Sequence, residues 1–442
     1  MSAAGNAHVV VFAFPFGSHA AALLDLARRM AAAAPGVRFS FFSTAATNRK
    51  VADLPSNLKV YDVDDGVPDG HVLTGNPLEA IGMFIDATPE NFRRQLGEAV
   101  EDAGARITCL LTDAFLWFAA DVAEELVVPW VAVWTAGPTA AALHMYTDEI
   151  HRRLGDGDRH PAGTLDFLPG MSAIRVGDLP MEILNLDTPF ARLLHSMGRV
   201  LPRAAAVAVN SFDGIEPAVE DDLKSKLQKL LTVGPPPAPR RSEDQSGCLA
   251  WLDRHSAAAV VYISFGSMLT PPPEELAAVA DAIEEEGIPY LWSIRESPQR
   301  QLLQEFFDRT ESIGKVVGWA PQPEVLAHPS VGVFVTHCGW NSVTESIIGG
   351  VPMICRPFFG DQMINRRRVE ETWQIGVGVG GGAFSRDAVV RALAIVMRSD
   401  EGTKFRENIS RLQKCAFSAI EENGSTTLNF ESLIRIATSP QN

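Results

Sequence analysis

VVVFAFPFGSHAAALLDLARRMAAAAPGVRFSFF, residues 9–42, is the stretch that sets the fold class. It begins with a continuous apolar run, Val9–Phe14, which predicts a strand buried on both faces. Residues 19–34 then repeat apolar side chains at helical spacing, and a proline–glycine pair ends that helix before a second apolar run, Arg38–Phe42. Strand, helix and strand in this order predict a βαβ unit with parallel strands.

The same alternation continues in two separate series. In the N-terminal half the further predicted elements are a strand at 108–112, a helix at 119–126 and a strand at 131–134. In the C-terminal half they are strands at 260–265, 290–293, 333–336 and 353–355, with helices at 274–286 and from about Asn341. A parallel sheet with helical crossovers is therefore expected in each half.

A proline-rich segment, VGPPPAP at residues 233–239, separates the two series and is typical of a linker. We therefore predict an α/β protein with two doubly wound, Rossmann-like domains that face each other across a cleft. The predicted boundaries are 1–232 for the N-terminal domain, 233–246 for the linker and 247–442 for the C-terminal domain. The last helix can pack back on the N-terminal domain.

Composition narrows the class of partner. The chain has 442 residues, of which 46% are hydrophobic and 21% charged, as in ordinary globular proteins. Its net charge of −16 argues against nucleic acid or an anionic membrane as partner, because both need clustered Lys and Arg. Any bound phosphate must therefore be held locally by helix ends and amide groups.

Cysteine usage and the N-terminus indicate a cytoplasmic protein. The five cysteines are scattered and lack CxxC spacing, so they suit a reduced compartment and offer neither a disulfide framework nor a zinc site. No Lys or Arg precedes Arg28, so the basic region of a signal peptide is missing. The uncharged run 126–147 is long enough to span a membrane, but Pro129, Gly137 and Pro138 favour a buried strand followed by a helix.

The loop after the predicted strand 333–336 carries the strongest chemical signal. It has the sequence HCGWNS, residues 337–342, and leads into a helix that contains Glu345. A strand, a tight glycine turn and a helix N-terminus present amide groups to a phosphate. Asn341 and Ser342 are expected as cap residues, and His337 adds a further donor. The motif predicts an anion site.

The surroundings of this loop extend the signal to a window of 44 residues, from Trp319 through Gln362. The window contains WAPQ at 319–322 and PFFGDQ at 357–362. It resembles the donor-binding box of plant UDP-dependent glycosyltransferases, a family with the two-domain GT-B fold. Segments along nearly the whole chain resemble flavonoid 3-O-glucosyltransferases that act on anthocyanidins and flavonols.

The resemblance implies a set of donor-binding residues. These are Trp319, Ala320, Gln322 and Glu345 for the uracil and ribose; Ser267, His337, Gly339, Asn341 and Ser342 for the diphosphate; Trp340, Asp361 and Gln362 for the hexose; and Ser18 and Thr135 from the N-terminal half. A glutamine at position 362 is usually linked with UDP-glucose, whereas histidine there is associated with galactose. UDP-glucose would be a co-substrate, and the family requires neither a metal nor another cofactor.

His19 and Asp113 each follow a predicted strand in the N-terminal half. Alone, the histidine could be structural and the aspartate a helix cap. Together they suit general base chemistry, since an imidazole can take a proton from a phenol or alcohol while a carboxylate fixes its tautomer. The family uses such a pair at matching positions, which implies direct displacement of UDP with inversion at the anomeric carbon.

An aromatic acceptor is expected from the phenylalanines at the strand ends. The resemblance implies that seven residues line its pocket: Phe14, Gly17, Leu78, Phe115, His144, Phe190 and Phe359. Leu78 stands where a relative that acts on flavonols has an amide, and Gly17 replaces a serine. Both differences bear on the preferred acceptor. The expected partners are UDP-glucose and a flavonoid aglycone, and we expect a monomer.

Several alternatives stay open at this point. The acceptor could be another plant phenolic, or the donor UDP-galactose. A UDP-sugar epimerase on the same fold would belong to a different reaction class, and a catalytically silent binder is a third possibility. The GxGxxG match at 376–381 is interpreted as a strand end plus a turn, with the next helix capped by Ser385, rather than as a dinucleotide site. Asp62-Val63-Asp64 is interpreted as a solvated turn rather than a metal motif.

Overall fold

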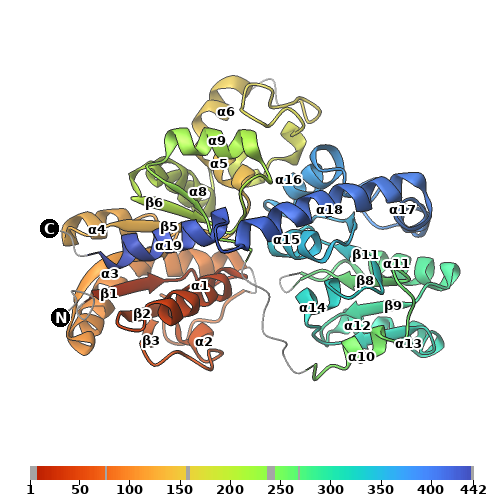
Figure 1. Ribbon diagram of the computed structural model, residues 1–442, viewed down its shortest axis with the longest axis horizontal. Coiled ribbons are helices and arrows are strands. Elements are labelled where there is room, and N and C mark those ends of the chain that lie inside the picture. Colours follow the sequence, from red (N-terminus) through yellow and green to blue (C-terminus); the bar gives the residue numbers. More distant parts are fainter. Residues whose placement is uncertain (1–6, 75–76, 156–159, 236–243, 267–268, 440–442) are drawn as a thin grey trace. The chain divides into compact units, whose positions relative to one another are not determined.

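The computed structural model describes residues 7–74, 77–155, 160–235, 244–266 and 269–439 (Figure 1). Most of the predicted linker (236–243) and Ser267 therefore lie outside the described residues. The chain forms two compact units. Unit 1 comprises Met1–Asp158, Met181–Gly234 and Glu422–Asn442, and unit 2 comprises Arg159–Pro180 and Pro235–Glu421.

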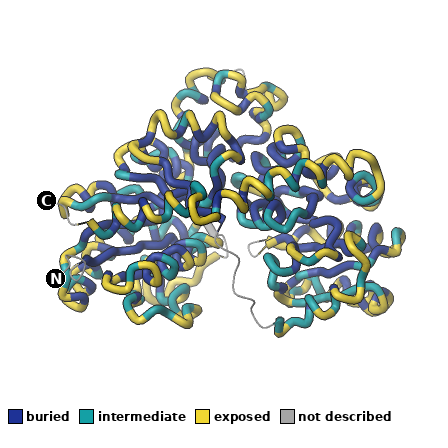
Figure 2. The backbone as a smooth tube through the Cα atoms, viewed as in Figure 1, coloured by how far each residue is buried: buried dark blue, intermediate teal, exposed yellow. Residues whose placement is uncertain are grey.

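Unit 1 is built on a seven-stranded parallel sheet with the order β3-β2-β1-β4-β5-β6-β7. The strands are β1 Ala7–Phe12, β2 Arg38–Thr44, β3 Leu58–Val63, β4 Arg106–Asp113, β5 Trp130–Trp134, β6 Ala206–Val209 and β7 Leu230–Thr232. Most of their residues are buried, as Figure 2 shows, and the edge strand β3 is the most exposed. Burial on both faces explains the continuous apolar runs in the sequence.

Helices cover both faces of this sheet. They are α1 His19–Ala33, α2 Ala45–Asn48, α3 Pro77–Ala103, α4 Ala119–Leu126, α5 Pro138–Met145, α6 Thr147–Leu154, α7 Met181–Leu184, α8 Pro189–Val200, α9 Pro217–Lys226 and α19 Ser425–Thr438. Alternate residues of β1 face opposite ways. Val9 and Val11 share a core cluster with residues of α1 and α19, whereas Phe12 stacks on Phe92 of α3 at a centroid distance of 4.4 Å.

The last helix, α19, packs on the sheet of unit 1. The hydroxyl of Thr108 donates to the carbonyl oxygen of Ala437 over 2.7 Å, and Asn429 Nδ2 donates to Thr232 Oγ1 over 2.9 Å. Leu433 and Ala437 are fully buried in the core that α1 also joins. The C-terminal end of the chain is thus part of the N-terminal unit.

Unit 2 is built on a six-stranded parallel sheet with the order β10-β9-β8-β11-β12-β13. Its strands are β8 Val260–Ser264, β9 Tyr290–Ser293, β10 Gly314–Val317, β11 Val331–Thr336, β12 Met353–Cys355 and β13 Gly376–Gly378. Its helices are α10 Cys248–Leu252, α11 Pro273–Glu286, α12 Pro298–Leu302, α13 Gln304–Arg309, α14 Gln322–Leu326, α15 Trp340–Gly349, α16 Gln362–Arg367, α17 Arg386–Arg398 and α18 Asp400–Ile420. Helices α11 and α17 share one core cluster with β8, β9 and β11.

Residues 160–180 group with unit 2, although the sequence analysis places them within a domain of residues 1–232. The physical reason is a buried ion pair. Asp178 accepts two hydrogen bonds from the Arg367 guanidinium of α16, with Nε–Oδ2 at 2.8 Å and Nη2–Oδ1 at 3.1 Å. Asp178 also caps its own turn by accepting from the Arg175 amide. Such a tertiary pair leaves no local pattern in the sequence.

Most predicted elements agree with the structure to within one or two residues. Strand β1 ends at Phe12 rather than Phe14, so Phe14 lies in the loop before α1. The glycines at 376–381 form a short strand and a turn, and Ser385 accepts from the Ala388 amide to cap α17. The prediction of a solvated turn at Asp62-Val63-Asp64 is wrong for the first two residues, because Asp62 and Val63 end strand β3 and Val63 is buried. Asp64 follows the strand and accepts from the Gly66 amide.

The uncharged run 126–147 forms β5 and α5, as expected. Within the described ranges, each helix is too short or too polar to cross a bilayer.

Candidate active site

Each sheet has a switch point at which its strand order reverses. In unit 1 this point lies between β1 and β4, and in unit 2 it lies between β8 and β11. In open parallel sheets, ligands bind at the carboxyl ends of the strands beside the switch point. His19 follows β1, Asp113 ends β4 and Thr135 follows β5, so adjacent strands bring these three residues together.

The His19 imidazole is held by Asp113. Its Nδ1 lies 2.7 Å from Asp113 Oδ2 and 3.2 Å from Thr135 Oγ1. Because an ionised carboxylate only accepts hydrogen bonds, Nδ1 carries the hydrogen and Nε2 carries the lone pair. The other carboxylate oxygen of Asp113, Oδ1, accepts from the Phe115 amide over 3.0 Å. The arrangement gives His19 the tautomer that a general base requires.

Aromatic rings flank this imidazole. Phe115 lies 4.7 Å and Phe14 5.4 Å from the His19 ring, measured between centroids. Phe190 in turn contacts Phe115 at 6.0 Å. The structure therefore gathers three of the predicted acceptor residues around the histidine. Phe84 on α3, which contacts Phe14 at 6.0 Å, extends the same apolar wall.

The other predicted residues of unit 1 lie at different depths. His144 on α5 is buried and contacts the Trp134 ring at 5.7 Å, and burial lowers the pKa of His144 to about 4. It is therefore neutral at physiological pH. Gly17 and Ser18 are exposed in the loop before α1, and Gly17 has φ +64°, a conformation that favours glycine. Leu78 is half-exposed near the start of α3.

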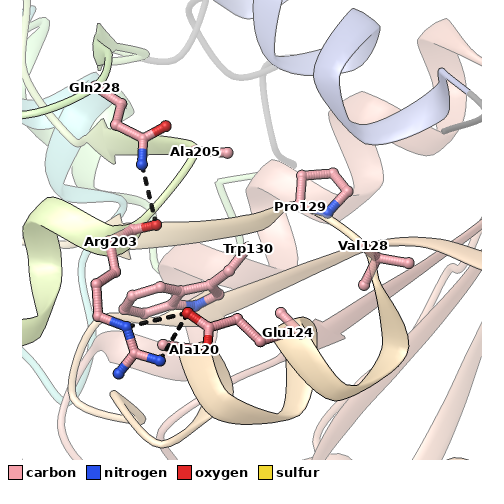
Figure 3. Close-up of a pocket in the computed structure, with 9 residues that line it drawn as sticks. Ala120, Glu124, Val128, Pro129, Trp130, Arg203, Ala205 and Gln228 are labelled. Carbon is pink, nitrogen blue, oxygen red and sulfur yellow. Dashed lines mark hydrogen bonds and ion pairs between the residues drawn. The ribbon is translucent and has the colours of Figure 1, made fainter. Parts of the chain in front are cut away.

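Figure 3 shows a small cavity in unit 1. Its volume is about 110 Å³, and Trp130, Arg203 and Gln228 are among its lining residues. Trp130 begins β5, so this cavity belongs to the amino ends of the strands. The Arg203 guanidinium is paired with Glu124 and Asp121. The cavity is therefore separate from the carboxyl ends of the strands, where His19 lies.

In unit 2, the loop after β11 turns sharply into α15. The left-handed residue of this turn is Cys338, with φ +62°, and not a glycine. The N-cap is Gly339 rather than Asn341 or Ser342, which corrects the predicted cap. Because a glycine cap has no side chain, it cannot occupy the N–H groups of the first turn. The N-terminus of α15 thus has the backbone arrangement that binds anions in other proteins.

Gly339 is needed because of His337. A Cβ added at Gly339 would lie 2.5 Å from His337 Nε2, and one added at Gly266 would lie 2.7 Å from His337 Cε1. The imidazole is thus packed between two glycine backbones. Its Nδ1 is buried without a hydrogen-bond partner among the described residues, and burial lowers its pKa to about 4. His337 can accordingly offer a neutral N–H donor rather than a positive charge.

Gln322 and Glu345 meet on the other side of α15. Gln322 Nε2 donates to Glu345 Oε2 over 2.7 Å and to Ser342 Oγ over 3.0 Å. Gln322 Oε1 accepts from the hydroxyl of Tyr262, a strand residue that sequence reasoning missed. Burial raises the pKa of Glu345 to about 7, although the Gln322 bond opposes that shift. Because burial disfavours the charged form of Glu345, additional hydroxyl donors would stabilise its carboxylate.

The remaining donor-box residues form two groups. Trp319 is 73% exposed, as a ring available for stacking would be, and Ala320 beside it is buried. Gln362 is buried and its Oε1 accepts from the Phe358 and Phe359 amides, which directs its NH₂ group away from that loop. The predicted acceptor residue Phe359 is half-exposed on the same loop.

Two further predicted donor residues, Asp361 and Trp340, lie at the starts of helices. Asp361 is the N-cap of α16 and accepts from Asn365 Nδ2 over 2.9 Å. Trp340 is buried at the start of α15 and contacts the Trp373 ring at 6.4 Å. Asn365 lies just beyond the 44-residue donor box, Trp319–Gln362, so sequence reasoning missed it. Within the described part of the chain, no group of three or more His, Cys, Asp or Glu side chains is arranged to hold a metal ion.

Two parallel α/β units, each with polar loops at the switch point of its sheet, define the GT-B class of glycosyltransferase folds. The chain belongs to the UDP-glucoronosyl and UDP-glucosyl transferase family, whose profile matches residues 240–416. The resemblance found in the donor box and the predicted fold class are thus confirmed.

Individual relatives extend the match over the whole chain. A flavonol 3-O-glucosyltransferase, F3GT2, from Actinidia chinensis var. chinensis is 51% identical, with 97% of this chain and 96% of the relative covered. A flavonoid 3-O-glucosyltransferase from Medicago truncatula is 50% identical, with 98% and 97% covered. A crystal structure of a UDP-glucose:anthocyanidin 3-O-glucosyltransferase in complex with UDP superimposes with a TM-score of 0.93 at 40% identity and covers 98% of each chain.

Proposed function

We propose that this protein transfers glucose from UDP-glucose to a hydroxyl group, the 3-OH of an anthocyanidin or flavonol, with inversion at the anomeric carbon. The observation that carries the proposal is the His19–Asp113 pair, with its 2.7 Å hydrogen bond at the switch point of unit 1. The similarity to flavonol and flavonoid 3-O-glucosyltransferases over nearly the full length supports this acceptor class.

In the proposed reaction His19 is the general base. Its Nε2 takes the proton of the acceptor hydroxyl, while Asp113 stabilises the imidazolium that forms. The acceptor oxygen bonds to C1 of the glucose as the bond from C1 to the UDP oxygen breaks. The rings of Phe14 and Phe115 suit a flat aromatic acceptor held beside the imidazole.

Unit 2 supplies the donor site in this proposal. Trp319 stacks on uracil and Glu345 accepts the ribose hydroxyls. Trp340, Asp361 and Gln362 hold the hexose. The N-terminus of α15 offsets the charge that develops on the leaving diphosphate, because helix amides and the helix dipole favour negative charge there. His337 adds a neutral donor. In this scheme, protein amides stabilise the leaving group and no metal ion takes part.

We also propose that the protein acts in the cytoplasm as a monomer. The scattered cysteines support a reduced compartment, and the net charge of −16 argues against association with an anionic membrane. Each unit carries its own complete parallel sheet, so neither sheet requires a strand from a second copy.

The test is an acceptor panel with purified protein. Cyanidin, quercetin, kaempferol, an isoflavone and a simple phenol are each incubated with UDP-glucose and, in parallel, with UDP-galactose. We expect 3-O-glucosides of the anthocyanidin and the flavonols, identified by mass and by position of the sugar. UDP-glucose alone tests for an epimerase, since that activity needs no acceptor. Conversion of the nucleotide sugar without acceptor, or no product with any flavonoid, would refute the proposal.

A further inference from the structure

Asn365 joins two loops of unit 2 that follow adjacent strands. It lies on α16 and is only 3% exposed. Its Nδ2 donates to the carbonyl oxygen of Cys338 and to Oδ2 of Asp361, both over 2.9 Å. A carboxamide nitrogen has two hydrogens, and both partners can only accept. The orientation of this side chain is therefore fixed and both of its N–H groups are used.

On one side, Asn365 holds the turn that leads into α15. Cys338 adopts a left-handed conformation, φ +62°, which costs a residue with a Cβ about 1 kcal/mol. Its amide donates to Thr336 Oγ1 over 3.2 Å, and its carbonyl accepts from Asn365. Hydrogen bonds on both sides thus maintain the strained residue. The residue that follows, Gly339, is the N-cap of α15.

On the other side, Asn365 holds the turn that leads into α16. Asp361 is the N-cap of that helix, and one of its carboxylate oxygens accepts from Asn365. The backbone amide of Asn365 also donates to the Asp361 carbonyl over 2.9 Å. Gln362, the next residue, is fixed through its own Oε1 by the Phe358 and Phe359 amides. Two of the three side chains assigned to the hexose, those of Asp361 and Gln362, therefore lie on one turn held by hydrogen bonds.

We propose that Asn365 is a positioning residue that sets the separation between the diphosphate subsite at α15 and the hexose subsite at α16. The inference rests on the proposed function, because it concerns how one donor molecule is held at both subsites. Asn365 touches neither the uridine nor the acceptor in this scheme. Its effect is transmitted through the Cys338 carbonyl and the Asp361 carboxylate, which belong to the two turns assigned to different parts of the same ligand.

A merely structural asparagine would behave differently. Loss of two buried hydrogen bonds destabilises a fold and lowers the fraction of active protein. Neither effect changes the ratio between the dissociation constants of UDP-glucose and UDP, because both ligands then lose the same population of sites. A change in the spacing of the subsites, in contrast, weakens UDP-glucose more than UDP. The ratio of the two constants is therefore the readout.

The experiment compares three variants of the full chain. Asn365→Asp keeps the size of the side chain, removes both donors and places a second carboxylate beside Asp361. Asn365→Ala removes the side chain and serves if the aspartate variant does not fold. Asn57→Ala is the matched control, because Asn57 Nδ2 bridges the carbonyl oxygens of Ala31, Ala34 and Val37 in unit 1. Titration calorimetry gives the dissociation constants of UDP and UDP-glucose without acceptor, and initial rates give kcat.

We expect both Asn365 variants to raise the ratio of the UDP-glucose to the UDP dissociation constant at least fivefold and to lower kcat at least tenfold. The Asn57 control should lose thermal stability while its ratio stays within twofold of wild type. A ratio within twofold of wild type in folded Asn365 variants would overturn the inference alone. Absence of UDP-glucose turnover by the wild type would instead remove the proposed function and the inference with it.

Discussion

His19 Nδ1 and Asp113 Oδ2 lie 2.7 Å apart although 93 residues separate them in the chain, because β1 and β4 are neighbours in the sheet of unit 1. Asp113 is almost completely buried. The carboxylate is thus placed where it can neutralise an imidazolium with little competition from water.

Replacement of His19 by alanine should reduce kcat by about 10²–10⁴-fold, the range that general base catalysis supplies. Asp113→Asn should lower kcat in the same direction and to a similar extent, since an amide neither fixes the Nδ1–H tautomer nor stabilises the imidazolium. Initial rates with UDP-glucose and quercetin measure both. His195→Ala is the matched control, because His195 makes a similar 2.7 Å bond to Asp148 on the surface. Near-normal rates for His19→Ala would refute the assignment of the base.

Glu345 should make UDP binding pH-dependent. Its pKa is raised by burial to about 7, and the ribose hydroxyls of the proposed complex need its charged form as acceptor. Affinity should therefore rise as the pH increases from 6 to 8, and binding should release protons near pH 7. Calorimetry in buffers of different ionisation enthalpy measures that release. In Glu345→Gln, only the pH dependence of UDP itself should remain.

Ionisation of Glu345, which should strengthen UDP binding, should lower the free energy of unfolding of the protein without ligand. Because the folded-state pKa of Glu345 lies above its ordinary value of 4.5, ionisation costs stability in the protein without ligand. That cost is absent below pH 4.5 and grows as the pH rises through 7. Glu345→Gln should thus raise the Tm at pH 8 and change it little at pH 5. A lower Tm at pH 8 would contradict this account.

The Asp178–Arg367 pair should hold residues 160–180 on unit 2. Both side chains are about nine-tenths buried. Asp178→Leu alone removes the buried partner of the Arg367 guanidinium, while the contact with the exposed Glu371 remains, and should cost about 3 kcal/mol of unfolding free energy. The double variant with Arg367→Met should recover most of that loss, as apolar replacements of buried pairs often do. Urea denaturation followed by fluorescence and circular dichroism measures both.

An exposed ion pair supplies the control for that series. Arg309 and Glu284 form a similar two-bond contact on the surface. Arg309→Met should leave the urea midpoint unchanged, because exposed pairs contribute little. If Asp178→Leu is equally silent, the segment 160–180 is held by other contacts.

Gly339→Ala should disturb the donor site without unfolding the chain. The new methyl group would lie 2.5 Å from His337 Nε2, so the imidazole or the turn has to move. We expect the affinity for UDP to fall at least tenfold while the Tm drops by a few degrees. Gly380→Ala is the control, because nothing lies within 4 Å of its added Cβ. Equal UDP affinity in both variants would show that the position of His337 is unimportant.

Local patterns predicted the secondary structure well because they depend on near neighbours in the chain. Apolar runs gave the strands, as at Val9–Phe12, and the Ser385 cap gave the start of α17. The glycines at 376–381 were separated from a dinucleotide motif because no helix follows them directly. The cap of α15 was predicted wrongly, since the space around His337 excludes any side chain at Gly339.

The sequence alone determined that the chain alternates strands and helices in two series, and that one 44-residue window resembles the donor-binding box of UDP-dependent glycosyltransferases. These features can be predicted from the sequence because buried strands, helices and loop motifs each depend on residues that are close together in the chain. Tertiary structure alone decided that Thr135 meets His19, that Asn365 bridges two loops and that residues 160–180 pack on unit 2. These contacts join residues far apart in the chain, and their partners are chosen by sheet order and burial rather than by any local pattern.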